Sequence, residues 1–300
     1  MKYRLLYLSM RLLSCIPFCV LYILSDLLYY LLYYIVRYRR HIARRNLTES
    51  FPERPLNEIK HIEKSFYQHF ADLLVESVKM CSMSEDEIRH RMHFKNVEEV
   101  NAAMRRGKSI AVYMGHYANW EWCVSLPLFL DKGAKSAQIY HKLSNKNMDR
   151  LMLHIRERMG SKCVEMRKTA RYVLELASEH ENCVIGFIAD QAPRKKDIHH
   201  YIPFLNHNTP VLTGTEKLVK HFGFETYFLH IKKIKRGYYI AEFIKLHDSP
   251  QSLPDFKLTD IYFQQLEKCI MERPELYLWT HNRFRSAQIM EKKNEIKIKD

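Results

Sequence analysis

The longest apolar stretch of the chain lies near its start. From Leu12 to Val36 nearly every residue is apolar, and Asp26 is the single charge. As an α-helix with a rise of about 1.5 Å per residue, this stretch is long enough to cross a bilayer core of about 30 Å. Tyrosines repeat at helical spacing toward its end, as in an interfacial aromatic belt, at Tyr29, Tyr30, Tyr33 and Tyr34. The pattern predicts an N-terminal membrane helix.

Two other interpretations compete with a spanning helix. A cleaved signal peptide is disfavoured because no small-residue cleavage site follows the apolar run. A helix lying in the membrane plane stays open, since Pro17 and Asp26 interrupt the run. Basic residues flank the run on both sides, at Lys2, Arg4, Arg11, Arg37, Arg39, Arg40, Arg44 and Arg45. The arginines that follow it predict a cytoplasmic location for the rest of the chain. We therefore divide the chain into a membrane anchor with a basic flank, 1–45, and a globular domain, 46–300.

The globular part alternates short apolar runs with helical patterns. Residues 55–80 read as a helix with one apolar side. Buried strands are predicted at Ser109–Met114, Gln138–His141, Cys163–Met166 and Cys183–Ala189. Helices are predicted at Asn119–Leu130, Asn145–Met159, Thr169–Glu179 and near Thr213–His221, and a hairpin at Thr226–Lys233 and Tyr238–Leu246. This alternation predicts an α/β fold with a sheet covered by helices on both faces, and chemistry at the ends of the strands.

The positive net charge of the chain favours anionic partners but does not distinguish between their classes. Lysine and arginine total 48 against 34 acidic residues, which gives a net charge of +14. Such a surface attracts nucleic acid, an anionic membrane face, a phosphorylated substrate or an acidic protein. The seven cysteines are scattered without a Cys-x-x-Cys pair, which disfavours a disulfide framework and a cysteine zinc site. The sequence also lacks a Walker A motif, a dinucleotide fingerprint and a Gly-x-Ser-x-Gly elbow.

One histidine stands where chemistry is expected, directly after a predicted buried strand. In the stretch 115–122, Asn119 is a plausible N-cap that places Glu121 in the first helical turn. Glu121 is then expected to hold one ring nitrogen of His116 and leave the other as a general base. Chance alone predicts about two His-x4-acid pairs in this composition, and the second one, His93/Glu98, lies in a charged stretch that reads as surface. Spacing and context together favour a structural and a catalytic histidine equally.

Six segments occur in the order of one known family: RRNLTESFPE (44–53), GHYANWEW (115–122), IYHKLSNKNMDRLMLHIRERMG (139–160), IADQAPRKKD (188–197), YIPFLNHNTPVLTGTEKLVKHFG (201–223) and PELYLWTHNRFR (274–285). Together they resemble the bacterial lipid A late acyltransferases, the lauroyl/myristoyl transferase family, over nearly the whole chain. Two departures are Phe204-Leu205-Asn206 in place of Phe-Phe-Gly and His281-Asn282-Arg283 in place of His-Arg-Arg. These departures leave the acceptor lipid open.

The resemblance implies a glycerolipid acyltransferase-like fold, a mixed sheet flanked by helices behind the N-terminal membrane helix, and an O-acyltransferase domain over 46–300. It implies that His116 is the general base and Glu121 its orienting carboxylate. Arg156, then Arg167, are candidates to stabilise an oxyanion or hold a phosphate. Asn119 joins them as a candidate binding residue. Asp190, which ends a buried strand, is a further candidate at the binding site, where it is expected to pin neighbouring arginines. Neither a cofactor nor a metal is implied.

The same resemblance suggests an acyl carrier protein as donor, an anionic lipid A precursor as acceptor, and the cytoplasmic leaflet of the inner membrane as the location. The basic clusters Arg194-Lys195-Lys196 and Lys232 to Arg236 are candidates to attract these partners. Alternatives are another lipid acceptor (a lysophospholipid, an aminolipid or a glycolipid) or a non-catalytic basic membrane protein. A metal hydrolase is disfavoured by the poor ligand spacing around His116, and a nucleic-acid binder by the lack of a reading element.

Overall fold

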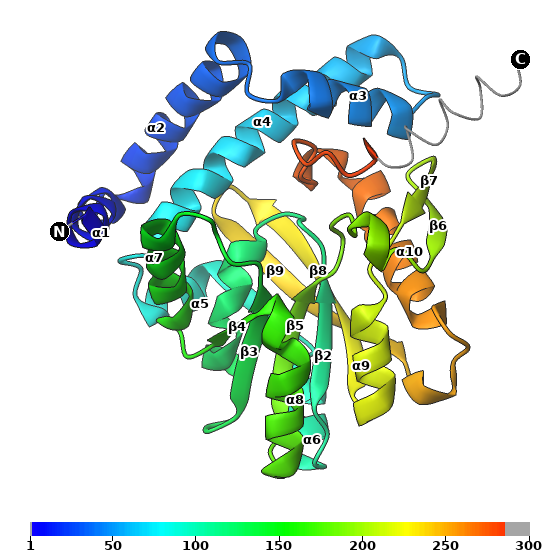
Figure 1. Ribbon diagram of the computed structural model, residues 1–300. Coiled ribbons are helices and arrows are strands. Elements are labelled where there is room, and N and C mark those ends of the chain that lie inside the picture. The colour runs from blue at the N-terminus through cyan, green and yellow to red at the C-terminus, as the bar shows by residue number, and fades with distance from the viewer. Residues whose placement is uncertain (1, 286–300) are drawn as a thin grey trace, which may run out of the picture.

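A mixed β-sheet forms the centre of the molecule. The computed structural model describes residues 2–285 (Figure 1). The sheet has the order β1-β9-β8-β2-β5-β3-β4, with strands β1 (Met92–Lys95), β2 (Ile110–Met114), β3 (Lys135–Tyr140), β4 (Lys162–Glu165), β5 (Cys183–Ile188), β8 (Glu225–Lys235) and β9 (Tyr238–His247). All its neighbours are parallel except the hairpin β8–β9. The central strand β2 is buried at all five positions, which is why its sequence is an unbroken apolar run.

The sequence patterns located most of this sheet. The predicted runs correspond to β2, β3, β4 and β5, and the predicted hairpin corresponds to β8 and β9. The patterns missed β1, the separate antiparallel pair β6 (Tyr201–Phe204) and β7 (His207–Pro210), and the long helix α10 (Lys257–Glu272). His93 lies on β1, but its side chain is exposed, so its interpretation as a surface residue is confirmed.

Helices cover the sheet and its upper end. They are α5 (Glu85–Arg91), α6 (Val97–Arg105), α7 (Lys146–Glu157), α8 (Thr169–Ser178), α9 (Gly214–Phe222) and α10, with 3₁₀ turns η2 (Trp120–Phe129), η3 (Met166–Lys168), η4 (Lys195–Asp197), η5 (Pro250–Ser252) and η6 (Pro274–Leu276). In Figure 1, α8 and α9 lie in front of the sheet, and α4 (Leu56–Lys79) crosses above its upper end. An α/β sheet flanked by helices is therefore confirmed.

The N-terminal part is a set of helices outside α4 rather than one rod. Helix α1 (Lys2–Ser14) ends before Pro17, and α2 (Phe18–Tyr30) continues as a π-helical turn, η1 (Leu31–Ile35). The break falls at Pro17 because proline lacks the amide hydrogen that a continuous helix needs. A further helix, α3 (Arg40–Ser50), then leads to α4. Phe18–Ile35 is long and apolar enough to cross a bilayer by length and composition, a test that core helices and signal sequences also pass.

Candidate active site

The loop after β2 presents His116 at the carboxyl edge of the sheet. Gly115 at the exit from the strand packs closely on Leu266, because a Cβ there would lie 2.6 Å from Leu266 Cδ1 and would force that side chain to move. The loop is held from the far end of the chain: the amide of Leu278 donates to the carbonyl of His116 at 3.1 Å, and the amide of Ala118 donates to the carbonyl of Leu276 at 2.9 Å. The C-terminal segment thus fixes the backbone on which His116 stands.

Asp190 holds the imidazole of His116. The ring Nδ1 lies 2.7 Å from Asp190 Oδ1, and the backbone amide of His116 donates to Asp190 Oδ2 at 3.0 Å. The Asp190 side chain is 3 % exposed, whereas the His116 side chain is 16 % exposed. Because a carboxylate accepts hydrogen bonds, the ring proton lies on Nδ1, and the lone pair of Nε2 faces away from Asp190. The amide Nε2 of Gln191 is 3.3 Å from that nitrogen.

Sheet register explains why these two residues meet. Met114 of β2 pairs with Ile188 of β5 in a parallel ladder. His116 and Asp190 each follow two residues later, so both emerge at the same edge of the sheet and on neighbouring strands. Asp190 was predicted to pin neighbouring arginines, but its carboxylate accepts hydrogen bonds from His116, because the pairing of β2 with β5 brings the two residues together.

The pair shifts both ionisation equilibria. Burial by itself lowers the pKa of His116, but the charge of Asp190 and the hydrogen bond to it prevail and raise that pKa above its ordinary value of 6.5. Burial likewise works to raise the pKa of Asp190, yet the contacts with His116 and the nearby charge of Arg283 lower it overall. Asp190 therefore stays ionised, and His116 is a stronger base than a free imidazole.

Glu121 has a different partner from the one predicted. Its carboxylate accepts two hydrogen bonds from Arg156, with Arg156 Nε at 2.9 Å from Oε2 and Nη2 at 2.6 Å from Oε1. The expected hydrogen bond from Glu121 to the His116 ring is thus a wrong prediction, because the forked guanidinium takes both carboxylate oxygens and Asp190 takes the ring nitrogen. Glu121 nonetheless acts on the site by charge, since it adds to the rise in the His116 pKa.

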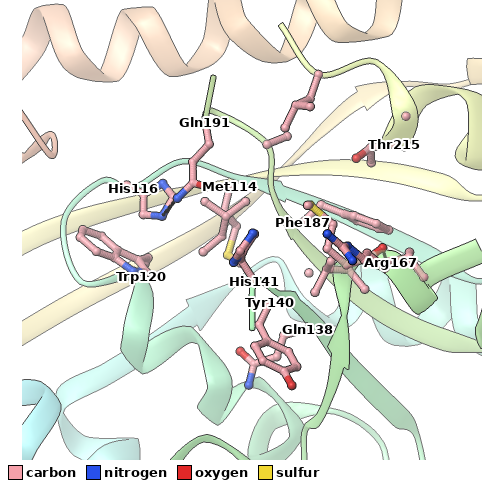
Figure 2. Close-up of a pocket in the computed structure, with 18 of the residues that line it drawn as sticks. Met114, His116, Trp120, Gln138, Tyr140, His141, Arg167, Phe187, Gln191 and Thr215 are labelled. Carbon is pink, nitrogen blue, oxygen red and sulfur yellow. Dashed lines mark hydrogen bonds between the residues drawn. The ribbon is translucent and has the colours of Figure 1, made fainter. Parts of the chain in front are cut away.

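The remaining predicted site residues divide into two groups. Arg167 lines the cavity opposite His116, as Figure 2 shows. Asn119 is the predicted N-cap, because its Oδ1 accepts from the amide of Trp122 at 3.1 Å. It is fully buried and its Nδ2 donates to Glu76 at 2.6 Å, so the prediction that Asn119 contacts a ligand is wrong. Two residues that contact His116 were not predicted as site residues: Gln191, and Trp120, whose ring centroid is 5.2 Å from that of His116. Each is next in sequence to a residue that was predicted, Asp190 and Glu121.

A cavity of about 860 Å³ opens in front of these groups. One end is polar and is lined by His116, Glu121, Arg156 and Gln191. The rest is lined mainly by apolar side chains, among them Ile139, Met148, Met152 and Leu218. Met114 and Phe187 belong to the same lining and are labelled in Figure 2. Its volume falls in the range of pockets that enclose organic ligands. A base, a guanidinium and an apolar chamber in one cavity suit proton abstraction beside a long hydrocarbon substituent.

Comparison with known proteins identifies relatives over most of the chain. A family model described as bacterial lipid A biosynthesis acyltransferase matches residues 3–286. The lipid A biosynthesis palmitoleoyltransferase of Escherichia coli (strain K12) is 22% identical over 279 residues, which cover 92% of this chain and 88% of that protein. The lipid A biosynthesis acyltransferase of Shigella flexneri matches to the same extent.

We expect Asp190→Asn to lower the pKa of His116 below its value in the native protein. The substitution removes the negative charge that raises this pKa and leaves the burial that lowers it. Titration of the His116 ring by NMR measures the shift, and Glu121→Gln is the matched control, with a smaller fall expected. An unchanged His116 titration in Asp190→Asn would show that the carboxylate does not govern the ring.

Proposed function

The chain belongs to the bacterial lipid A biosynthesis acyltransferase family, and from this premise we propose that it transfers a fatty acyl group from an acyl thioester to a hydroxyl of a lipid A precursor at the inner membrane. Acyltransferase activity on lipid A follows from the family. The thioester donor, the residues that act and the membrane location belong to the proposal, as do a glycerolipid acyltransferase-like fold and a catalytic domain over 46–300 behind an anchor over 1–45.

The observation that carries the proposed mechanism is the orientation of His116, with Nδ1 on Asp190 and Nε2 toward the cavity. Nε2 takes the proton of the acceptor hydroxyl while the hydroxyl oxygen attacks the carbonyl carbon of the thioester. A tetrahedral oxyanion forms, the carbon–sulfur bond breaks, and the departing thiolate takes the proton back from His116. The hydroxyl oxygen gains the acyl group and the donor leaves as a thiol, without an acyl-enzyme.

Positive charge beside the base suits the oxyanion. Arg156 donates two hydrogen bonds to Glu121, retains further N–H donors, and is one of the residues that line the cavity. We assign Arg156 to the oxyanion and Glu121 to the positioning of Arg156. Arg167, across the cavity, is assigned to a phosphate of the acceptor or donor, and the apolar chamber is assigned to the acyl chain.

The two basic clusters differ in how much charge they leave for a partner. Lys233 and Arg236 contact the buried Asp72, at 3.3 and 2.6 Å, so this cluster has a structural use. Arg194, Lys195 and Lys196 are exposed on the segment that follows Asp190 and Gln191. An acidic carrier protein that docks there would present its thioester to the cavity. We therefore assign the second cluster to the acyl donor.

His116→Ala should lower acyl transfer by about 10²- to 10⁴-fold, the range that general-base removal costs. The assay uses purified full-length protein, an acyl carrier thioester and a tetra-acylated disaccharide precursor, with product identified by mass spectrometry. His93→Ala is the matched control, because His93 begins the other His-x4-acid pair and is exposed on β1. Native-like transfer by His116→Ala would contradict His116 as the general base. Transfer by the native protein to a lysophospholipid, an aminolipid or a glycolipid, but not to the disaccharide precursor, would contradict the proposed acceptor.

Reversing charge at Lys195 and Lys196 should raise the KM for an acyl carrier thioester several-fold and leave kcat nearly unchanged. The reason is that an exposed basic patch steers an acidic partner without touching the reacting atoms. The double variant Lys108→Glu/Lys132→Glu is the charge-matched control, since both lysines are exposed before the amino ends of β2 and β3. An equal KM in the two double variants would contradict docking at this cluster. A KM for the coenzyme A thioester that rises just as much would contradict it too.

A further inference from the structure

The N-terminal helices expose apolar residues on their outer sides, and we refer to these residues together as the apolar stripe. On α2 and η1 the exposed large apolar residues recur at intervals of three and four, at Val20, Ile23, Leu24, Leu27, Tyr30, Leu31, Tyr34 and Ile35. On α1 the exposed apolar residues are Leu5, Leu8, Leu12 and Leu13. This spacing places each set on one side of its helix. A surface of this apolar extent marks a membrane or protein interaction site.

The opposite side of α2 is docked on the globular domain along its whole length. At its start the ring of Phe18 lies 6.2 Å from that of Trp122. In the middle, Ser25 Oγ donates to Asp72 at 2.8 Å. In the following turn η1, the ring of Tyr33 lies 5.4 Å from that of Tyr67 on α4. No long stretch of α2 is therefore free to be surrounded by lipid on all sides.

Charged groups accompany these contacts. Arg236, in the turn between β8 and β9, reaches Asp26 and Asp72 at 2.6 Å each. Glu76 of α4 is fully buried and accepts a hydrogen bond from Tyr22 of α2 at 3.0 Å. If α2 crossed the bilayer in this docked position, α4 and the β8–β9 turn would enter the hydrocarbon with it. Charged side chains at the bilayer centre are strongly unfavourable, and non-helical backbone facing lipid does not occur.

We propose that α1, α2 and η1 lie in the plane of an anionic membrane leaflet, with the apolar stripe inserted and the docked side holding the catalytic domain at the surface. The chain then does not cross the bilayer, and its N-terminal helix and its catalytic domain share one side. Charge favours an anionic leaflet as the occupant, because residues 1–45 hold eight basic residues and one acidic residue. Arg4, Arg37 and Arg39 are exposed at the two ends of the stripe.

This placement brings the membrane next to the cavity. Tyr7 of α1 packs edge-on against His154 of α7, with ring centroids 5.1 Å apart. Met148, Met152 and Arg156 of the same helix α7 line the cavity. One helix therefore separates the inserted segment from the site, which suits an acceptor that stays in the leaflet. The inference rests on the proposed membrane location, but the topology itself is tested without any measurement of acyl transfer.

The first test is sidedness of the two parts in cells. In a background with Cys15, Cys19 and Cys163 changed to serine, single cysteines are placed at exposed Arg4, at the polar end of the stripe on α1, and at exposed Ser178 on α8. Each is treated with a membrane-impermeant maleimide in spheroplasts and in inverted vesicles. Both positions should react only from the cytoplasmic side. Labelling of the two positions from opposite sides would mean that α2 spans, and would overturn the inference.

The second test identifies what covers the stripe. Purified full-length protein is floated with vesicles of phosphatidylglycerol and phosphatidylethanolamine. Ile23→Glu/Leu27→Glu should reduce the bound fraction at least about tenfold with an unchanged Tm, because two charges enter the apolar face. Leu174→Glu, at an equally exposed leucine on α8, is the control and should float like the native protein. Flotation that survives in the double variant, or a native dimer that this variant dissociates, would contradict insertion of the stripe.

Discussion

The site depends on one contact, the 2.7 Å pairing of His116 Nδ1 with the buried carboxylate of Asp190. The contact exists because β2 and β5 are parallel neighbours in register, so that residues two positions beyond Met114 and Ile188 leave the sheet side by side. It fixes the ring tautomer, turns Nε2 toward the cavity and raises the basicity of the imidazole. The C-terminal segment supports it from behind by hydrogen bonding to the backbone of the His116 loop.

Two carboxylates each bind a different group at this cavity: Asp190 binds the His116 imidazole, and Glu121 binds the Arg156 guanidinium. Asp190 is short, sits at a strand end and binds one imidazole nitrogen together with the His116 amide. Glu121 is longer, stands on η2 and reaches across to the fork of Arg156 on α7. The result is a base and a fixed guanidinium at one end of a mainly apolar cavity, with Arg167 across it, an arrangement that suits acyl transfer to a lipid hydroxyl.

Local patterns predicted what local physics decides. Unbroken apolar runs such as β2 and β5 were located because strands buried on both faces have no polar alternation, and Asn119 was located as an N-cap. Strand β1 was not predicted, because its four residues alternate apolar side chains with histidine and lysine and so resemble an exposed segment. Asp190 was not predicted as the partner of His116, because it lies 74 positions away and reaches His116 only through the pairing of β2 with β5. Glu121 is near His116 in sequence, but its side chain binds Arg156 on α7. Likewise, the apolar run predicted membrane contact, but only the folded chain shows that one side of α2 is docked on α4.

The pH dependence of kcat/KM for acyl transfer, compared between the native protein and Asp190→Asn, tests the central contact most directly. A base whose pKa is raised is protonated and inactive below that pKa, so the native rate should rise with pH along a limb centred above 6.5. In Asp190→Asn the limb should move to lower pH while the plateau falls. A limb that stays in place when the carboxylate is removed would contradict a His116 base governed by Asp190.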